Sequence, residues 1–228
     1  MLPVIHQSSN LDKLATARFF ASVRILTALA MLGSIYWQVE DRLANNLFRP
    51  GEYFAYFTID SSMVAAVSLA VSGIWIWAGN VETRLLTIIR LSVTSYAVVV
   101  SIVYNALLRG MPNAAIDGDY QWPVPPNEIL HVWAPIIVAL DWLLAVPAVQ
   151  LRLRALFWVL VFPLGWVGFS IVRGFATDWW PYWFINPNDK GGVTGMLTYI
   201  FGIMIFLIVV SFLALVLSRL ARKLLVRD

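Results

Sequence analysis

Residues 194–218 read TGMLTYIFGIMIFLIVVSFLALVLS, an apolar run without a single charged side chain. A helix of about 20 apolar residues crosses the hydrocarbon core of a bilayer. Lipid offers no partners for backbone N–H and C=O groups, so a spanning segment must form a helix or join a closed barrel. The run lacks the alternating polarity of a barrel strand. It therefore predicts a transmembrane helix.

Five further apolar stretches of similar length lie before this one. They are residues 19–39, 53–78, 85–108, 128–149 and 155–176. The whole chain is 60% hydrophobic, has a mean hydropathy of +0.76 and is only 13% charged, whereas a soluble domain is about 25% charged. We expect an all-α polytopic bundle of six transmembrane helices over residues 19–218. It would lie between a cytoplasmic arm, 1–18, and a basic cytoplasmic tail, 219–228.

Lysine and arginine counts predict the orientation, because cytoplasmic loops carry an excess of both. With the N-terminus inside, nine of the sixteen would be cytoplasmic: Lys13, Arg18, Arg84, Arg152, Arg154, Arg219, Arg222, Lys223 and Arg227. Five would be outside: Arg42, Arg49, Arg109, Arg173 and Lys190. The excess predicts that both termini are cytoplasmic. Because basic residues flank apolar segments, they indicate membrane orientation and not a nucleic-acid partner.

The composition excludes several kinds of chemistry. The chain has no cysteine, which excludes disulfides, thiolate metal sites and thiol nucleophiles. Of its two histidines, His6 lies in the N-terminal arm, so imidazole chemistry within the membrane must use His131. Metal hydrolysis usually needs three or more protein ligands, and we expect neither a metal nor a cofactor.

Three charged residues share one depth in the inner leaflet, by the helical rise of about 1.5 Å per residue. They are Arg24, Arg90 and Asp141. One interpretation is a structural ion pair or triad that locks helices together, which would lose stability if one partner were removed. The other interpretation is a proton or ion pathway, because intramembrane carboxylates often mark such paths.

A second polar layer lies near the outer face. Thr58 is expected about six residues inside its helix and His131 about four inside its own, so both side chains reach one level. A hydroxyl and a neutral imidazole are the minimal parts of a nucleophile and its general base. Alternatively, the threonine hydroxyl donates to the carbonyl of Phe54 one turn earlier, and the histidine bonds to another helix.

Other polar residues near this level could support such a pair. A third group must orient the imidazole ring, and donors must stabilise the oxyanion of an acyl-transfer intermediate. Candidates for orienting His131 are Asp60, Asn127 and Glu128, and candidates for oxyanion donors are Asn105, Arg109 and Arg173.

Four segments resemble the motifs of a prokaryotic six-transmembrane family distantly related to the androgen-induced and androgen-dependent membrane hydrolases. They are Phe57-Thr58-Ile59-Asp60-Ser61-Ser62, Asn105-Ala-Leu-Leu-Arg109-Gly110, His131-x3-Pro135-x5-Asp141-Trp142, and Arg173-Gly174 with Trp180-Pro181-Tyr182-Trp183-Phe184. The resemblance spans roughly residues 19–218. The family usually has glutamine and asparagine at the positions of Asp60 and Ser62, so this sequence departs from the pattern at both. We include Ser62 with Asp60 among the residues expected to support the Thr58–His131 pair.

The related eukaryotic hydrolases cleave fatty acid esters of hydroxy fatty acids, so the resemblance implies a carboxylic-ester hydrolase of lipid (fatty acyl) esters in a bacterial plasma membrane. Thr58 would be its threonine nucleophile and His131 its base, with membrane lipids as surroundings and a lipid ester as substrate. The alternatives are an ion- or proton-coupled transporter or channel that uses the intramembrane Asp and Arg residues, and a membrane scaffold without chemistry.

Overall fold

The computed structural model describes residues 4–111, 117–189 and 191–225, with side chains from residue 12 to residue 224 in these ranges. Six helical segments in this part of the chain are long and apolar enough to cross a membrane. They are α1 (Val4–Ala44), α3 (Phe57–Trp77), α4 (Arg84–Val103) with η1 (Tyr104–Leu108), α5 (Val124–Glu128) with η3 (Ile129–Trp133) and α6 (Ala134–Leu144), α7 (Ala155–Thr177), and α8 (Gly192–Leu225). The chain is an all-α bundle of the multi-pass membrane type.

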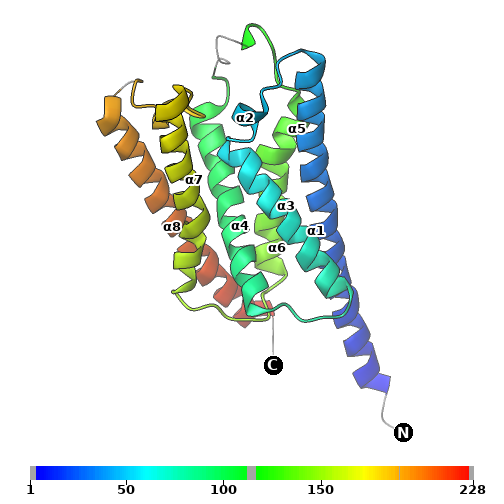
Figure 1. Ribbon diagram of the computed structural model, residues 1–228. Coiled ribbons are helices and arrows are strands. Elements are labelled where there is room, and N and C mark those ends of the chain that lie inside the picture. Colours follow the sequence, from blue (N-terminus) through cyan, green and yellow to red (C-terminus); the bar gives the residue numbers. More distant parts are fainter. Residues whose placement is uncertain (1–3, 112–116, 190, 226–228) are drawn as a thin grey trace.

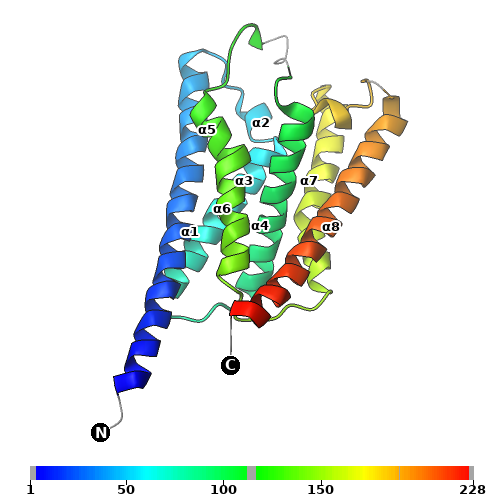
Figure 2. The ribbon, with the colours of Figure 1, turned by 180° about the vertical axis from the view of Figure 1, so that it is seen from behind.

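The six segments form one bundle in which α4 lies between α3, α6, α7 and α8 (Figures 1 and 2). The start of α1 and the end of α8 lie at one end of the bundle, which we call the proximal end. The short helix α2 (Pro50–Tyr53) and the 3₁₀ turn η4 (Trp183–Ile185) lie at the opposite, distal end.

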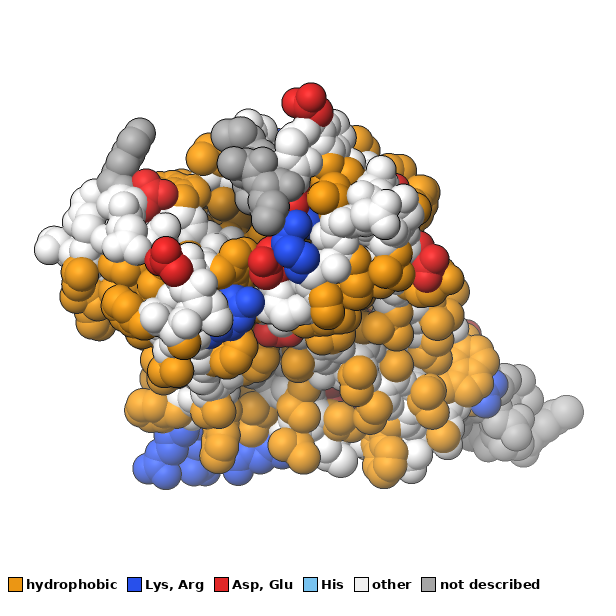
Figure 3. All heavy atoms as spheres, turned by 45° about the horizontal axis from the view of Figure 1, so that its top comes forward, with side chains coloured by type: hydrophobic (Ala, Val, Ile, Leu, Met, Phe, Trp, Pro, Cys, Tyr) orange, Lys and Arg blue, Asp and Glu red, His pale blue; other side chains and the backbone are white. Residues whose placement is uncertain are grey.

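Hydrophobic side chains cover the sides of the bundle, while charged side chains gather at its two ends (Figure 3). The helices α7 and α8 are the least covered by protein, with 22% and 17% of their most apolar windows buried. These two helices therefore present most of their surface to lipid. By contrast, α1 and α3 approach closely at Gly73, where a Cβ atom would lie 2.8 Å from the Ala21 carbonyl oxygen.

Several helix limits differ from the predicted stretches. The predicted span 53–78 is broken, because α2 ends at Tyr53 and α3 begins only at Phe57. The predicted span 128–149 ends at Leu144. Pro147 follows shortly after, and proline disfavours helical geometry in the residue before it.

Two spans contain a π-helical turn at the distal end. In η1 the Arg109 N–H donates to the Tyr104 carbonyl, and in η3 the Ala134 N–H donates to the Ile129 carbonyl. Pro135 follows η3 and has no N–H to offer the carbonyl four residues earlier, which favours the wider turn there. Such turns occur frequently at functional sites.

Candidate functional site

A buried ion network lies toward the proximal end. The Arg24 Nε donates to both carboxylate oxygens of Asp141, at 2.9 and 3.0 Å, and its Nη1 donates to the Ser72 hydroxyl at 2.8 Å. Arg90 Nε lies 3.7 Å from Asp141 Oδ2. The structure thus brings together the three residues that their shared depth had grouped, Arg24, Arg90 and Asp141.

Sequence reasoning missed a fourth member of this network, Glu82. It lies in the connector between α3 and α4, and Arg90 Nη1 donates to its two oxygens at 3.0 and 2.9 Å. Arg90 Nη2 also donates to the Ala145 carbonyl at 2.6 Å. The side chains of Arg24, Arg90, Glu82 and Asp141 are at most 4% exposed. Two positive charges meet two negative charges, so the network is neutral as a whole.

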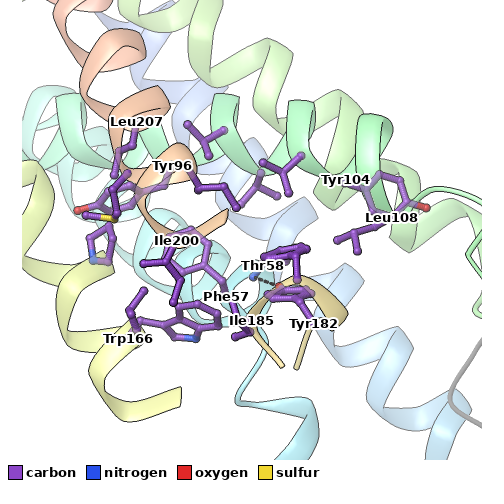
Figure 4. A pocket seen from close by; sticks show the side chains of 18 residues that line it. Phe57, Thr58, Tyr96, Tyr104, Leu108, Trp166, Tyr182, Ile185, Ile200 and Leu207 are labelled. Carbon is purple, nitrogen blue, oxygen red and sulfur yellow. Dashed lines mark hydrogen bonds between the residues drawn. The ribbon is translucent and has the colours of Figure 1, made fainter. Parts of the chain in front are cut away.

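A separate apolar cavity of about 80 Å³ lies toward the distal end between α3, α4, α7, α8 and η4 (Figure 4). Four residues in its wall carry hydroxyl groups: Thr58, Tyr96, Tyr104 and Tyr182. The Tyr96 hydroxyl is already engaged, because it donates to the Val159 carbonyl at 2.6 Å. The Tyr104 hydroxyl accepts from the Asn127 side-chain amide, so Thr58 and Tyr182 supply the polar chemistry of an otherwise hydrophobic space.

Thr58 is the second residue of α3 and is 7% exposed. It therefore lies in the first turn and not six residues into the helix, because the chain bends before Phe57. First-turn N–H groups have no acceptor within their own helix, and the Thr58 N–H donates to the Tyr182 hydroxyl at 3.4 Å (Figure 4). No hydrogen bond from the Thr58 hydroxyl to the Phe54 carbonyl is found among the described residues.

Tyr182 remains a neutral phenol beside Thr58. Desolvation raises the pKa of Tyr182 above its ordinary value, and hydrogen bonding to Thr58 lowers it by less. Its oxygen accepts the Thr58 N–H, and its O–H is a donor beside the Thr58 side chain.

His131 lies in η3 with its ring held in one tautomer. Its Nδ1 lies 2.8 Å from the Asn127 carbonyl oxygen, and a carbonyl can only accept, so Nδ1 carries the proton in the neutral ring. The lone pair is then on Nε2, which has no hydrogen-bond partner in the described part of the chain. An imidazole fixed in this way can accept a proton through Nε2.

Tyr104 connects His131 to the cavity. Its ring lines the cavity wall and stacks on the His131 ring with centroids 3.8 Å apart. The Asn127 side-chain amide donates to the Tyr104 hydroxyl at 2.6 Å. Tyr104 was not among the predicted site residues, because an aromatic residue at a helix end is typical of the membrane interface.

Thr58 and His131 come from neighbouring elements but do not touch through a hydrogen bond within the described side chains. Ser61 and Ser62, one turn beyond Thr58, line a small cavity of about 10 Å³ together with Leu130, the residue before His131. The Thr58–His131 pair remains a prediction.

The predicted supporting residues Asn105, Arg109 and Glu128 form an exposed network beside Tyr104. Arg109 Nη1 lies 2.8 Å from Glu128 Oε1, and its Nε donates to Asn105 Oδ1 at 2.7 Å. The Arg109 guanidinium also lies 5.1 Å from the Tyr104 ring centroid. These contacts hold the end of η1 to the end of α5 and engage the donors of Arg109.

The other predicted supporting residues lie apart. The half-buried Asp60 carboxylate has no hydrogen bond or ion pair with the described residues, and Ser62 faces the small cavity. Arg173 lies near the end of α7, with its guanidinium 4.3 Å from the Trp179 ring. No described contact joins Asp60 or Arg173 to Thr58 or His131.

No protein-family model matches the chain, and comparisons with curated protein sequences and with solved structures find no match. In the described residues, no three His, Asp or Glu side chains are grouped so that they could hold a metal ion.

Proposed function

We propose that this protein is an intramembrane hydrolase of fatty acyl esters, with Thr58 as nucleophile and His131 as general base. The observation that carries the proposal is the position of Thr58 in the wall of an apolar cavity whose distal wall residue, Tyr104, stacks on His131. An acyl chain fits such a space by its chemistry, and its walls on α7 and α8 belong to the helices most exposed to lipid.

The reaction follows the usual course of acyl transfer. The Thr58 hydroxyl oxygen attacks the ester carbonyl carbon while Nε2 of His131 takes the hydroxyl proton. The imidazolium returns that proton to the departing alkoxide, which leaves an acyl-threonine and a free alcohol. Water, deprotonated by Nε2, then releases the fatty acid and restores Thr58.

The tautomer of His131 and the phenol of Tyr182 support this assignment. The Nδ1–H donation to Asn127 leaves the lone pair on Nε2, as a general base requires. The O–H of Tyr182, a donor beside Thr58, is suited to stabilise the oxyanion. Because no direct hydrogen bond joins Thr58 to His131 among the described residues, the mechanism needs one bridging water. A proton can pass through one such water.

The membrane and the orientation belong to the same proposal. The excess of basic residues supports cytoplasmic termini, and the sequence resemblance supports a bacterial plasma membrane. With cytoplasmic termini, the cavity would lie in the outer leaflet. The absence of cysteine allows a direct test with single-cysteine variants of the exposed residues Asn45 and Lys13. In intact cells a membrane-impermeant maleimide should label Asn45→Cys and not Lys13→Cys; the reverse would contradict the orientation.

The proximal ion network does not favour the transporter alternative. Each of its carboxylates is held by an arginine, and both arginines are held in turn by the carboxylates. Such mutual pairing is suited to a structural lock, whereas a transport path needs groups that release and rebind their ion.

The central test is hydrolysis of p-nitrophenyl palmitate by the purified protein in uncharged detergent. Thr58→Val and His131→Gln should each lower the rate by roughly 10²–10⁴-fold. Thr94→Val is the matched control, because Thr94 is buried, its hydroxyl has no hydrogen-bond partner and it does not line the cavity. Equal turnover by wild type and Thr58→Val would refute the mechanism.

A further inference from the structure

Buried donors without acceptors are concentrated in one distal segment. Seven buried side-chain polar atoms lack a hydrogen-bond partner in the described part of the chain, and four of them belong to residues 170–183. These four are Ser170 Oγ, Arg173 Nη1, Trp180 Nε1 and Trp183 Nε1. Buried polar groups in proteins are nearly always paired, so this concentration requires an explanation.

Three of the four side chains gather on one face of α7. Ser170, Arg173 and Gly174 follow Trp166 by four, seven and eight residues, which places all of them on the same helical face. The Trp180 ring packs directly on this face, because a Cβ atom at Gly174 would lie 2.5 Å from a ring atom. We call Ser170, Arg173 and Trp180 the distal donor cluster.

The cluster offers positive charge and donors but no fixed acceptor. The Arg173 guanidinium and the Trp180 indole can only donate, and the Ser170 hydroxyl can do so. No carboxylate forms an ion pair with Arg173 in the described chain, and its neighbours are the Trp179 ring and Gly51 of α2. An arginine at a membrane surface ordinarily extends into water, whereas Arg173 Nη1 is fully buried. A ligand that matches this cluster must carry negative charge and accept hydrogen bonds, as an oxyanion does.

The cluster lies on the distal side of the apolar cavity, along the same helix. Trp166 lines the cavity, and Arg173 lies two turns further along α7, about 10 Å toward the distal end. A row of aromatic rings lies between the cluster and the cavity. The Arg173 guanidinium lies over the Trp179 ring. The ring centroids of Trp179 and Tyr56 are 5.6 Å apart, and those of Tyr56 and Tyr182 are 5.7 Å apart. The separation of about 10 Å along α7 is short enough for one amphiphile to reach from the cavity to the cluster.

We propose that the distal donor cluster binds the anionic headgroup, phosphate or carboxylate, of the amphiphile whose chain occupies the cavity. The inference rests on the proposed function only in taking the cavity as the acyl site, and it names the substrate class as an anionic lipid. Arg173 supplies the charge, and Ser170 and Trp180 supply directed hydrogen bonds.

The test is binding of three ligands that share one chain: hexadecyl phosphate, palmitate and hexadecanol. Binding to the purified full-length protein in dodecyl maltoside is followed by tryptophan fluorescence. At least one anion should bind on the order of 10–100-fold more tightly than hexadecanol, the range for hydrogen bonds to a charged group. The anion that binds more tightly identifies the headgroup. None of the ligands contains an ester, so the result is independent of hydrolysis.

Variants locate the effect. Arg173→Gln should remove the preference for the anion, Arg173→Lys should retain part of it, and Ser170→Ala should weaken anion binding by roughly 2–10-fold. Arg109→Gln, which removes an equal charge at the same end from an arginine paired with Glu128, should leave the preference intact. Equal affinity of the wild-type protein for all three ligands would refute the proposal, even if no variant folds. A folded Arg173→Gln protein that still binds an anion more tightly than hexadecanol would also refute it.

Discussion

The proximal ion network and the distal donor cluster both contain arginine within a membrane bundle, but they differ in how their hydrogen bonds are satisfied. Arg24 and Arg90 direct their guanidinium groups at two carboxylates, a serine hydroxyl and a backbone carbonyl. Arg90 Nε also lacks a hydrogen bond in the described part of the chain, but it lies 3.7 Å from an Asp141 carboxylate oxygen. Arg173 has one buried nitrogen without an acceptor, an aromatic ring beside it and no carboxylate partner among the described residues. A network in which every arginine is paired with a carboxylate stabilises the fold, whereas an arginine without a carboxylate partner is available to an anionic ligand.

The largest effect is expected from removing a charge at the proximal end. Asp141→Asn leaves two buried arginines facing one carboxylate, and breaking a buried pair costs roughly 3–5 kcal/mol of unfolding free energy. Denaturant titration in mixed micelles measures this loss. Asp60→Asn is the matched control at the distal end, and it should leave stability unchanged or higher because Asp60 has no partner among the described residues. Similar losses in both variants would remove the distinction between the two regions.

A smaller effect is expected for Glu82→Gln, the network member in the connector. Arg90 would lose a charge-assisted pair and keep its bond to the Ala145 carbonyl, so the expected cost is about 1.5–3 kcal/mol. Under the same titration, Glu128→Gln should cost less than 1 kcal/mol, because its ion pair with Arg109 is exposed and such pairs contribute roughly 0–1 kcal/mol. A Glu82→Gln protein as stable as wild type would mean that the connector does not belong to the lock.

The smallest effect concerns Tyr104, at the boundary of the cavity. Tyr104→Phe removes the hydroxyl that accepts from Asn127 and keeps the ring stacked on His131, so the cost should be about 0.5–1.5 kcal/mol. Tyr104→Leu should additionally lower ester hydrolysis, because the His131 ring would lose its stacking partner. The p-nitrophenyl palmitate assay reports this difference. Equal rates for both variants would show that the stack does not position the histidine.

The sequence predicted the helix limits best where the apolar run and the helix end at nearly the same residues. The stretches 85–108 and 155–176 agree closely with the spans Arg84–Leu108 and Ala155–Thr177. The break before Phe57 was missed because Tyr53 to Phe57 are apolar or aromatic throughout, so hydropathy does not change where the backbone turns. The end at Leu144 was missed because the residues around Pro147 continue the apolar run.

Depth along the helices grouped Arg24, Arg90 and Asp141 correctly, because rise per residue is fixed in a helix. Glu82 was missed because it lies in a connector, where that rule does not apply. The distal site was harder to predict. The tautomer of His131 depends on the Asn127 carbonyl, and the unpaired donors near Arg173 depend on a tryptophan that packs on Gly174 from beyond the helix end.

The ion network also constrains how the chain is inserted as it leaves the ribosome. Arg24 is 117 residues ahead of its partner Asp141. At about 5–20 residues per second of synthesis, the first helix must wait roughly 6–23 seconds for that carboxylate. Glu82, within 4.0 Å of Arg24 in the finished bundle, emerges about midway through this interval. It can serve as an early counter-charge that holds α1, α3 and α4 together until α6 arrives.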